Sequence, residues 1–362
     1  MKATLKKFNL NLHELEQQIG CLDLQWKIFN SPAFASNDLQ MEKDIKLLTG
    51  INGLGVFRKK FEYNSIVVTL YGFFEQFIEE IIVAYLRALN ELVPQYNLLP
   101  ENIKKNHVEA TTVLLSKPDL QKFRDFIKVE ELIGNLHSCI SNTSAYRLNA
   151  YAFTYHTANF KVDVIDQAFA KIGVQNLSKR IQNTRDLIDH LTNVDPDRLR
   201  VSNASAGEFF YEINDLAERR NEVAHGSPCE ILSNSFLIEY LKFIQKYAES
   251  ICSILLMEYL TQEIKLSRNI GIPIAGYNNK IVCFNLNQSS VAIGDRIFAE
   301  TTDSQIKCME GTIISIQVDD ISYQTYCCQT PINIGLKVDF KAKSTYSYYL
   351  AEPASTPWEV DK

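Results

Sequence analysis

The sequence predicts a mainly α-helical chain that ends in a small all-β module, built as a barrel or a sandwich. Long segments with apolar residues at three- and four-residue spacing, which is typical of helices, continue to about residue 265. From about residue 269 the chain changes to short β-branched and aromatic runs separated by polar turns, which indicates strands. We therefore expect a helical domain at 1–265, a β-rich module at 269–355 and a tail at 356–362.

The first part of the chain contains one strong core helix. Residues 65–89 have apolar side chains around much of the helix circumference, so we expect a helix largely buried between its neighbours. Residues 8–48 indicate a more polar helical region. Residues 91–200 predict shorter helices broken by prolines, with a polar connection at 141–160.

A further helix begins at a capping box. Ser205 and Glu208 have the spacing at which each side chain satisfies an exposed backbone amide of the other residue. We expect this helix to run to His225, because Gly226 and Pro228 give a clear stop signal. Residues 234–264 then form the longest regular helical pattern.

Six runs after this helix predict strands of the β module. They read KIVCFNL, DRIFAET, GTIISIQV, SYQTYCC, GLKVDFKAK and STYSYYLAE. The role of the module stays open among binding RNA, binding a partner protein, binding a phage component and stabilising a dimer.

One arginine stands out on the helix that ends at His225. An advance of about 100° per residue places Arg220 near the middle of an apolar sector. The other members of the sector are Phe209, Phe210, Ile213, Leu216, Ala217, Val223 and Ala224. A guanidinium there is costly unless it is paired or solvated. There are two structural explanations. Arg220 forms a buried ion pair with Glu75, or its aliphatic part packs in the sector while the guanidinium reaches water.

The neighbours of Arg220 favour a functional explanation. Asn221 and His225 lie one turn apart, and together with Asn214 they line one edge of the sector, while Arg219 lies outside it. A histidine in the last turn of a helix feels the negative end of the helix dipole, which favours its protonated form. An arginine, an amide and a histidine are the groups that phosphodiester transfer needs.

The stretch RRNEVAHG at 219–226 resembles the signature of the HEPN superfamily, an arginine followed by a polar residue and, after four to six residues, a histidine. The wider context is similar to the bacterial RiboL-PSP and MAE-like branch over about residues 60–260. The stretch LYGFFEQFIEE, which includes Glu75, resembles that branch's first core helix. The stretch YHTANFKVDVIDQAFAKIGV resembles its segment leading to the motif helix.

The resemblance implies a HEPN-type helical bundle that forms a homodimer and cleaves RNA, with tRNA and mRNA as the candidate substrates, at a shared cleft without a metal or other cofactor. It implies Arg220, Asn221 and His225 as catalytic residues, with Glu75 holding Arg220, and Asn214 and Arg219 in support. His156 belongs to a polar loop that could approach the cleft. The expected role is that of a toxin or anti-phage effector, with an antitoxin or regulatory protein as partner. The alternative is a non-catalytic module that binds RNA, a nucleotide or a protein through the same cleft.

Composition limits how the protein can contact nucleic acid, membranes and metal ions. A net charge of −6 argues against a broad basic surface, so contact with nucleic acid should be local. The eight cysteines contain no Cys-x-x-Cys pair, and no apolar stretch is long enough to span a membrane. We therefore expect a cytoplasmic protein with free thiols and no membrane contact. The only metal-binding alternative is the RDLIDH stretch with Asp186, Asp189 and His190.

Overall fold

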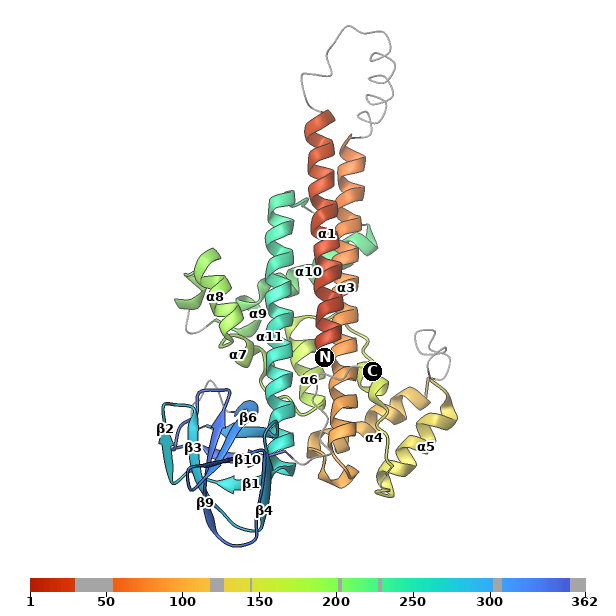
Figure 1. The fold of residues 1–362 in the computed structure, drawn as a ribbon. Coiled ribbons are helices and arrows are strands. Elements are labelled where there is room, and N and C mark those ends of the chain that lie inside the picture. The colour runs from red at the N-terminus through yellow and green to blue at the C-terminus, as the bar shows by residue number, and fades with distance from the viewer. Residues whose placement is uncertain are drawn as a thin grey trace, which may run out of the picture.

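Three long helices form the centre of the molecule in a computed structural model (Figure 1). The structure describes residues 1–29, 55–117, 127–143, 145–200, 204–226, 230–301 and 308–351. Helix α1 (Lys2–Phe29) runs antiparallel to α3 (Gly55–Leu92), and α11 (Asn234–Leu266) packs against both. The core helix predicted at 65–89 is confirmed as part of α3, whose buried face includes Ile78, Ile81 and Leu86.

The region between the long helices consists of shorter helices, as the sequence predicts. They are η2 (Tyr96–Leu98), α4 (Glu101–Leu115), α5 (Val129–Ile140), η3 (Ala150–Thr154), α6 (Val162–Lys171), α7 (Leu177–Ile181), α8 (Arg185–Val194) and η4 (Arg198–Arg200). The connection expected at 141–160 differs from a plain polar loop, because η3 buries Phe153 and its neighbours against α3 and α4. Of the helical region expected at 8–48, residues 30–48 lie outside the described residues.

The helix expected from Ser205 to His225 is two helices, so this part of the prediction is wrong. The capping box is present, with Ser205 and Glu208 bonded to each other's backbone amides at the start of α9 (Ala206–Phe209). Phe210 then leaves helical geometry, with φ −108° and ψ 44°, because its ring is fully buried against Tyr247 and Phe243. Helix α10 (Tyr211–His225) follows, and Gly226 ends it in the left-handed conformation with φ 69°.

The C-terminal part is an antiparallel β module, as predicted. Its main sheet has the order β1-β10-β5-β6-β9-β3-β2, with β7 paired to β6, and a separate ribbon joins β4 to β8. The described strands β1 and β2 form the two ends of the path, so the sheet is an open half-barrel. The strands are β1 (Arg268–Gly271), β2 (Ala275–Tyr277), β3 (Ile281–Leu286), β4 (Ser289–Ala292), β5 (Arg296–Glu300), β6 (Cys308–Val318), β7 (Ile321–Tyr323), β8 (Thr325–Cys328), β9 (Ile332–Val338) and β10 (Ser347–Leu350).

The β module is joined to the end of α11 by a buried ion pair. Arg296 of β5 donates to both carboxylate oxygens of Glu263, at 2.5 and 3.0 Å, and also contacts Glu310 of β6. Glu263 is only 1% exposed. Phe298 and Cys308 belong to the same apolar cluster as the helices. The two parts therefore share one packed interface.

A buried histidine supports the shorter helices. His107 of α4 is fully buried, and its Nε2 accepts a hydrogen bond from the backbone amide of Asn149 at 3.0 Å. This bond requires a lone pair on Nε2, so the ring is neutral. Burial lowers the pKa of His107 to about 4, from 6.5.

His107 should make the fold labile to acid. The His107 ring takes up a proton at a higher pH in the unfolded chain than in the folded chain. Its contribution to the free energy of unfolding is therefore fully present above pH 6.5 and is lost as the pH drops toward 4. We expect the loss to reach about 3 kcal/mol at the lower end. Denaturant unfolding of the wild type and His107→Gln across this range should show a much smaller loss in the variant. A loss of equal size in both would contradict the assignment, and His137→Gln, at an exposed position of α5, serves as the control.

Within the described residues, no helix combines the length and apolar character needed to cross a membrane.

Candidate functional site

Helix α10 leaves the core along its length and presents its last two turns at the surface. Ile213, Leu216 and Ala217 are buried between neighbouring helices. Beyond them the exposure rises, with Arg220, Asn221 and Val223 half-buried and Ala224 and His225 exposed. The predicted apolar sector is therefore correct up to Ala217 and wrong for Ala224. Arg220 lies one turn after the buried Ala217, where α10 begins to be exposed.

Arg220 lies over an aromatic ring instead of pairing with Glu75. Its guanidinium carbon is 5.4 Å from the centroid of the Tyr71 ring, and its Nη1 donates to Asn221 Oδ1 at 3.3 Å. Among the residues that the structure describes, no carboxylate forms an ion pair with Arg220. Five other half-buried arginines have carboxylate partners, namely Arg58, Arg180, Arg198, Arg219 and Arg296, whereas half-buried Arg268 donates to the Ser290 carbonyl. The expected contact between Glu75 and Arg220 is thus not formed.

A neighbouring segment fixes the orientation of Asn221. Asn159 donates from Nδ2 to Asn221 Oδ1 at 2.5 Å, the same oxygen that accepts from Arg220. With this oxygen engaged, the Nδ2 hydrogens of Asn221 are left without a partner among the described residues. The amide can therefore donate to an incoming anion next to the guanidinium.

Tyr71 links the arginine to the segment that carries Asn159. The hydroxyl of Tyr71 on α3 accepts a hydrogen bond from the backbone amide of Phe160 at 3.0 Å. Burial raises the pKa of Tyr71 to about 12, so the hydroxyl remains protonated at neutral pH. Tyr71 was not predicted from the sequence, because a tyrosine in an apolar helix pattern gives no sign of a neighbouring arginine.

Asn214 and Arg219 have structural roles. Asn214 Oδ1 accepts from the backbone amide of Val162 at 3.0 Å, which ties the start of α6 to α10. Arg219 donates to Asp215 at 2.6 Å and to the Tyr63 hydroxyl at 2.8 Å. Burial alone would lower the pKa of Arg219, but these bonds outweigh it and raise that pKa. Arg219 faces its own helix and α3, where solvent exposure was expected.

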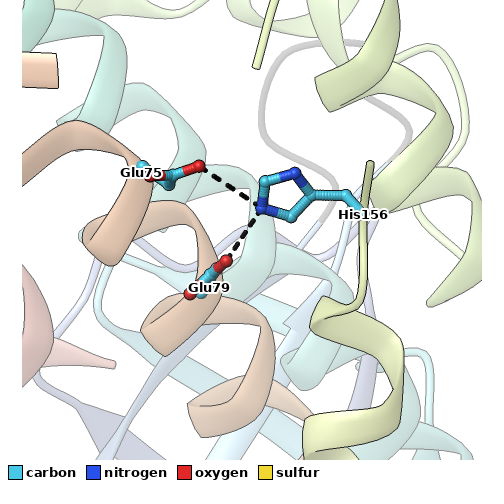
Figure 2. A group of neighbouring side chains, drawn as sticks. All are labelled: Glu75, Glu79 and His156. Atoms are coloured by element: carbon cyan, nitrogen blue, oxygen red, sulfur yellow. Dashed lines mark hydrogen bonds and ion pairs between the residues drawn. The ribbon is translucent and has the colours of Figure 1, made fainter. Parts of the chain in front are cut away.

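His156, in the segment after η3, packs against α3 beside Glu75. Its Nε2 is 2.9 Å from a carboxylate oxygen of Glu79 and 3.5 Å from one of Glu75, as Figure 2 shows. Its ring packs against Phe160, with the centroids 4.2 Å apart. The histidine therefore belongs to the segment that also carries Asn159. This segment reaches the motif through Asn159, which bonds Asn221. Glu79, one turn from Glu75, is not among the residues predicted from the sequence.

His225 is the most exposed member of the motif. It occupies the last turn of α10, and no hydrogen bond joins its ring to another described residue. Arg220 and Asn221 contact each other, and the helix carries His225 one further turn along. The ring is thus available to a ligand or to a second copy of the chain.

The RDLIDH stretch does not form a metal-binding group within the described part of the chain. Asp189 pairs with Arg185 on the surface of α8, at 3.6 Å. His190 packs toward Phe243, and burial lowers its pKa. The described residues hold one group with a metal-binding donor set, formed by Glu75, Glu79 and His156.

Comparison with known proteins identifies the helical part. A profile of the RiboL-PSP-HEPN family matches residues 34–257, which is more than half of the chain. The matched region contains α3, α10 and most of α11, and it ends before the β module. No curated protein matches the sequence. The chain belongs to the RiboL-PSP-HEPN family.

Proposed function

We propose that the protein is a metal-independent endoribonuclease whose site is formed by the exposed end of α10 in a homodimer. The observation that carries the proposal is the environment of Arg220. A half-buried guanidinium lies over the Tyr71 ring, contacts Asn221 and has no carboxylate partner among the described residues. A phosphate group is the ligand that such a fork of donors binds best.

The reaction is a transesterification within RNA. One His225 accepts the proton of a 2'-hydroxyl, the 2'-oxygen forms a bond to phosphorus, and the bond from phosphorus to the 5'-oxygen breaks. A second His225, from the other copy, donates a proton to the leaving 5'-oxygen. The products are a 2',3'-cyclic phosphate and a 5'-hydroxyl, and no metal ion takes part in any step.

Arg220 and Asn221 act on the phosphate. The guanidinium stabilises the charge that grows on the equatorial oxygens in the transition state. The amide of Asn221, held by Asn159, donates a further hydrogen bond from Nδ2. In the proposed dimer the exposed ends of two α10 helices face one another, which brings both copies of His225 to one phosphodiester.

The proposed biological role is that of a toxin or anti-phage effector acting on tRNA or mRNA in the cytoplasm. An antitoxin or regulatory protein would then cover the exposed end of α10. The exposure of Ala224 and His225 supports such a contact surface.

The first test is cleavage of total bacterial RNA and purified tRNA in the presence of EDTA. We expect wild-type protein to leave cyclic phosphate ends and His225→Ala to be slower by at least about a hundredfold, because the variant dimer lacks both the general base and the general acid. Sequencing of fragment ends reports the chemistry, and mass measurement in solution reports the dimer.

His137→Gln controls for loss of a surface histidine and should cleave like wild type. If wild type and His225→Ala were folded, dimeric and equally inert, the ribonuclease proposal would be wrong. RNA binding by both proteins would then favour the non-catalytic alternative.

A further inference from the structure

Three side chains from two separate segments meet beside Tyr71. Glu75 and Glu79 lie one turn apart on α3, so both carboxylates lie on one helix face. His156 approaches them from the segment after η3 (Figure 2). Oxygen and nitrogen atoms of the three residues all lie within 4.8 Å of one another.

The hydrogen bond of His156 Nδ1 determines whether Nε2 faces the two carboxylates with a lone pair or with a proton. His156 Nδ1 lies 2.8 Å from the carbonyl oxygen of Ala158, which can only accept, so Nδ1 carries a proton. The neutral ring then directs the lone pair of Nε2 toward Glu75 and Glu79. A lone pair and two carboxylates repel each other, so the site requires a cation between them, either a proton or a metal ion.

Charge and spacing favour a metal ion. Two carboxylates and a neutral imidazole form a donor set with a charge of −2, which suits a divalent ion. Ligand atoms bound about 2.1 Å from one ion lie roughly 3.0–3.4 Å apart. The distances from Nε2, 2.9 and 3.5 Å, are close to this range. A histidine ligand whose other nitrogen donates to a backbone carbonyl is the usual arrangement in metal sites.

We propose that Glu75, Glu79 and His156 bind a divalent transition-metal ion of the Zn²⁺ or Co²⁺ type. An imidazole ligand disfavours Mg²⁺ and Ca²⁺, which prefer oxygen. The side chains are 29%, 15% and 18% exposed, so an ion can enter from solvent. Three protein ligands leave a fourth position for water.

The ion would brace the segment that orients Asn221. His156 and Asn159 are three residues apart, and the Phe160 amide between this segment and α3 already bonds Tyr71. Bound metal fastens the same segment to α3 at a second point. The ion takes no part in the proposed cleavage, and its binding is independent of whether RNA is cleaved.

The test is titration of full-length, chelator-treated protein with Co²⁺, followed by competition with Zn²⁺, in the absence of RNA. The visible spectrum of Co²⁺ separates nitrogen and oxygen ligands from the thiolates of exposed Cys21 and Cys327. We expect one ion per chain with nitrogen and oxygen ligands. His156→Gln and Glu79→Gln should each bind at least about tenfold more weakly.

Glu80→Gln is the matched control, because Glu80 lies next to Glu79 on α3 but pairs with Lys7. It should bind Co²⁺ like wild type. Glu75→Gln, whose carboxylate lies farther from His156, provides a second variant if Glu79→Gln fails to fold. No binding by wild type, a thiolate spectrum, or equal binding by wild type and all folded variants would overturn the proposal and leave a proton as the cation at His156.

Discussion

Arg220→Ala is expected to slow RNA cleavage about a thousandfold while the protein stays folded. The loss is large because a guanidinium that stabilises transition-state charge on phosphate typically contributes this much or more. The cost to stability should be small, about 1 kcal/mol, since the variant loses mainly the contact with the Tyr71 ring. Single-turnover cleavage and thermal unfolding of the same preparation measure the two effects.

Two further arginine variants make this result specific. Arg220→Lys keeps the charge and loses the planar fork, so its activity should lie between those of the wild type and Arg220→Ala. Arg200→Ala removes an exposed arginine that pairs with Asp197 on the surface, and it should cleave normally. Full activity in Arg220→Ala would remove the arginine from the mechanism.

The second large effect is expected at the junction of α11 and the β module. Arg296→Ala should lower the free energy of unfolding by about 3–5 kcal/mol, because it takes the bidentate guanidinium away from the buried Glu263 carboxylate. The variant also removes the ion pair between Arg296 and Glu310. Denaturant unfolding followed by circular dichroism gives the size of the loss.

A double variant separates the effect of removing one charge of the buried ion pair from the effect of losing side-chain contacts. Arg296→Met combined with Glu263→Met replaces both buried charges with apolar groups of similar length, and it should regain much of the lost stability. If the double variant were as unstable as Arg296→Ala, the contact of the Arg296 guanidinium with the Phe298 ring would be the main contribution. The exposed pair of Arg200 and Asp197 again supplies the control, with a change of less than about 0.5 kcal/mol.

Local rules in the sequence predict most of the fold. Apolar periodicity locates α3 and α11, and the capping box at Ser205 and the glycine at 226 locate the ends of the motif region. These features depend on residues close in sequence. The break at Phe210 was not predictable in this way, because it results from contacts with Phe243 and Tyr247 of a later helix.

The candidate site also depends on contacts between residues far apart in the chain, which local rules do not reveal. The helical wheel places Arg220 and Asn221 together correctly, since both lie on one helix. It does not reveal that Glu75 faces His156, because that contact joins residues far apart in the chain. Glu212 is a parallel case, since this residue is buried and accepts hydrogen bonds from Nη1 and Nη2 of Arg198 on η4. Charged residues on a predicted helix give no sign of partners that arrive from elsewhere in the sequence.

The junction at Glu263 and Arg296 also determines how the molecule diffuses. Because Phe298 and Cys308 are packed among the helical side chains, we expect that the β module does not rotate independently of the helices. A fluorescent label on β3 and one on α5 should therefore report the same rotational correlation time. Anisotropy decay of the two labelled proteins would register any independent movement as an additional, faster component.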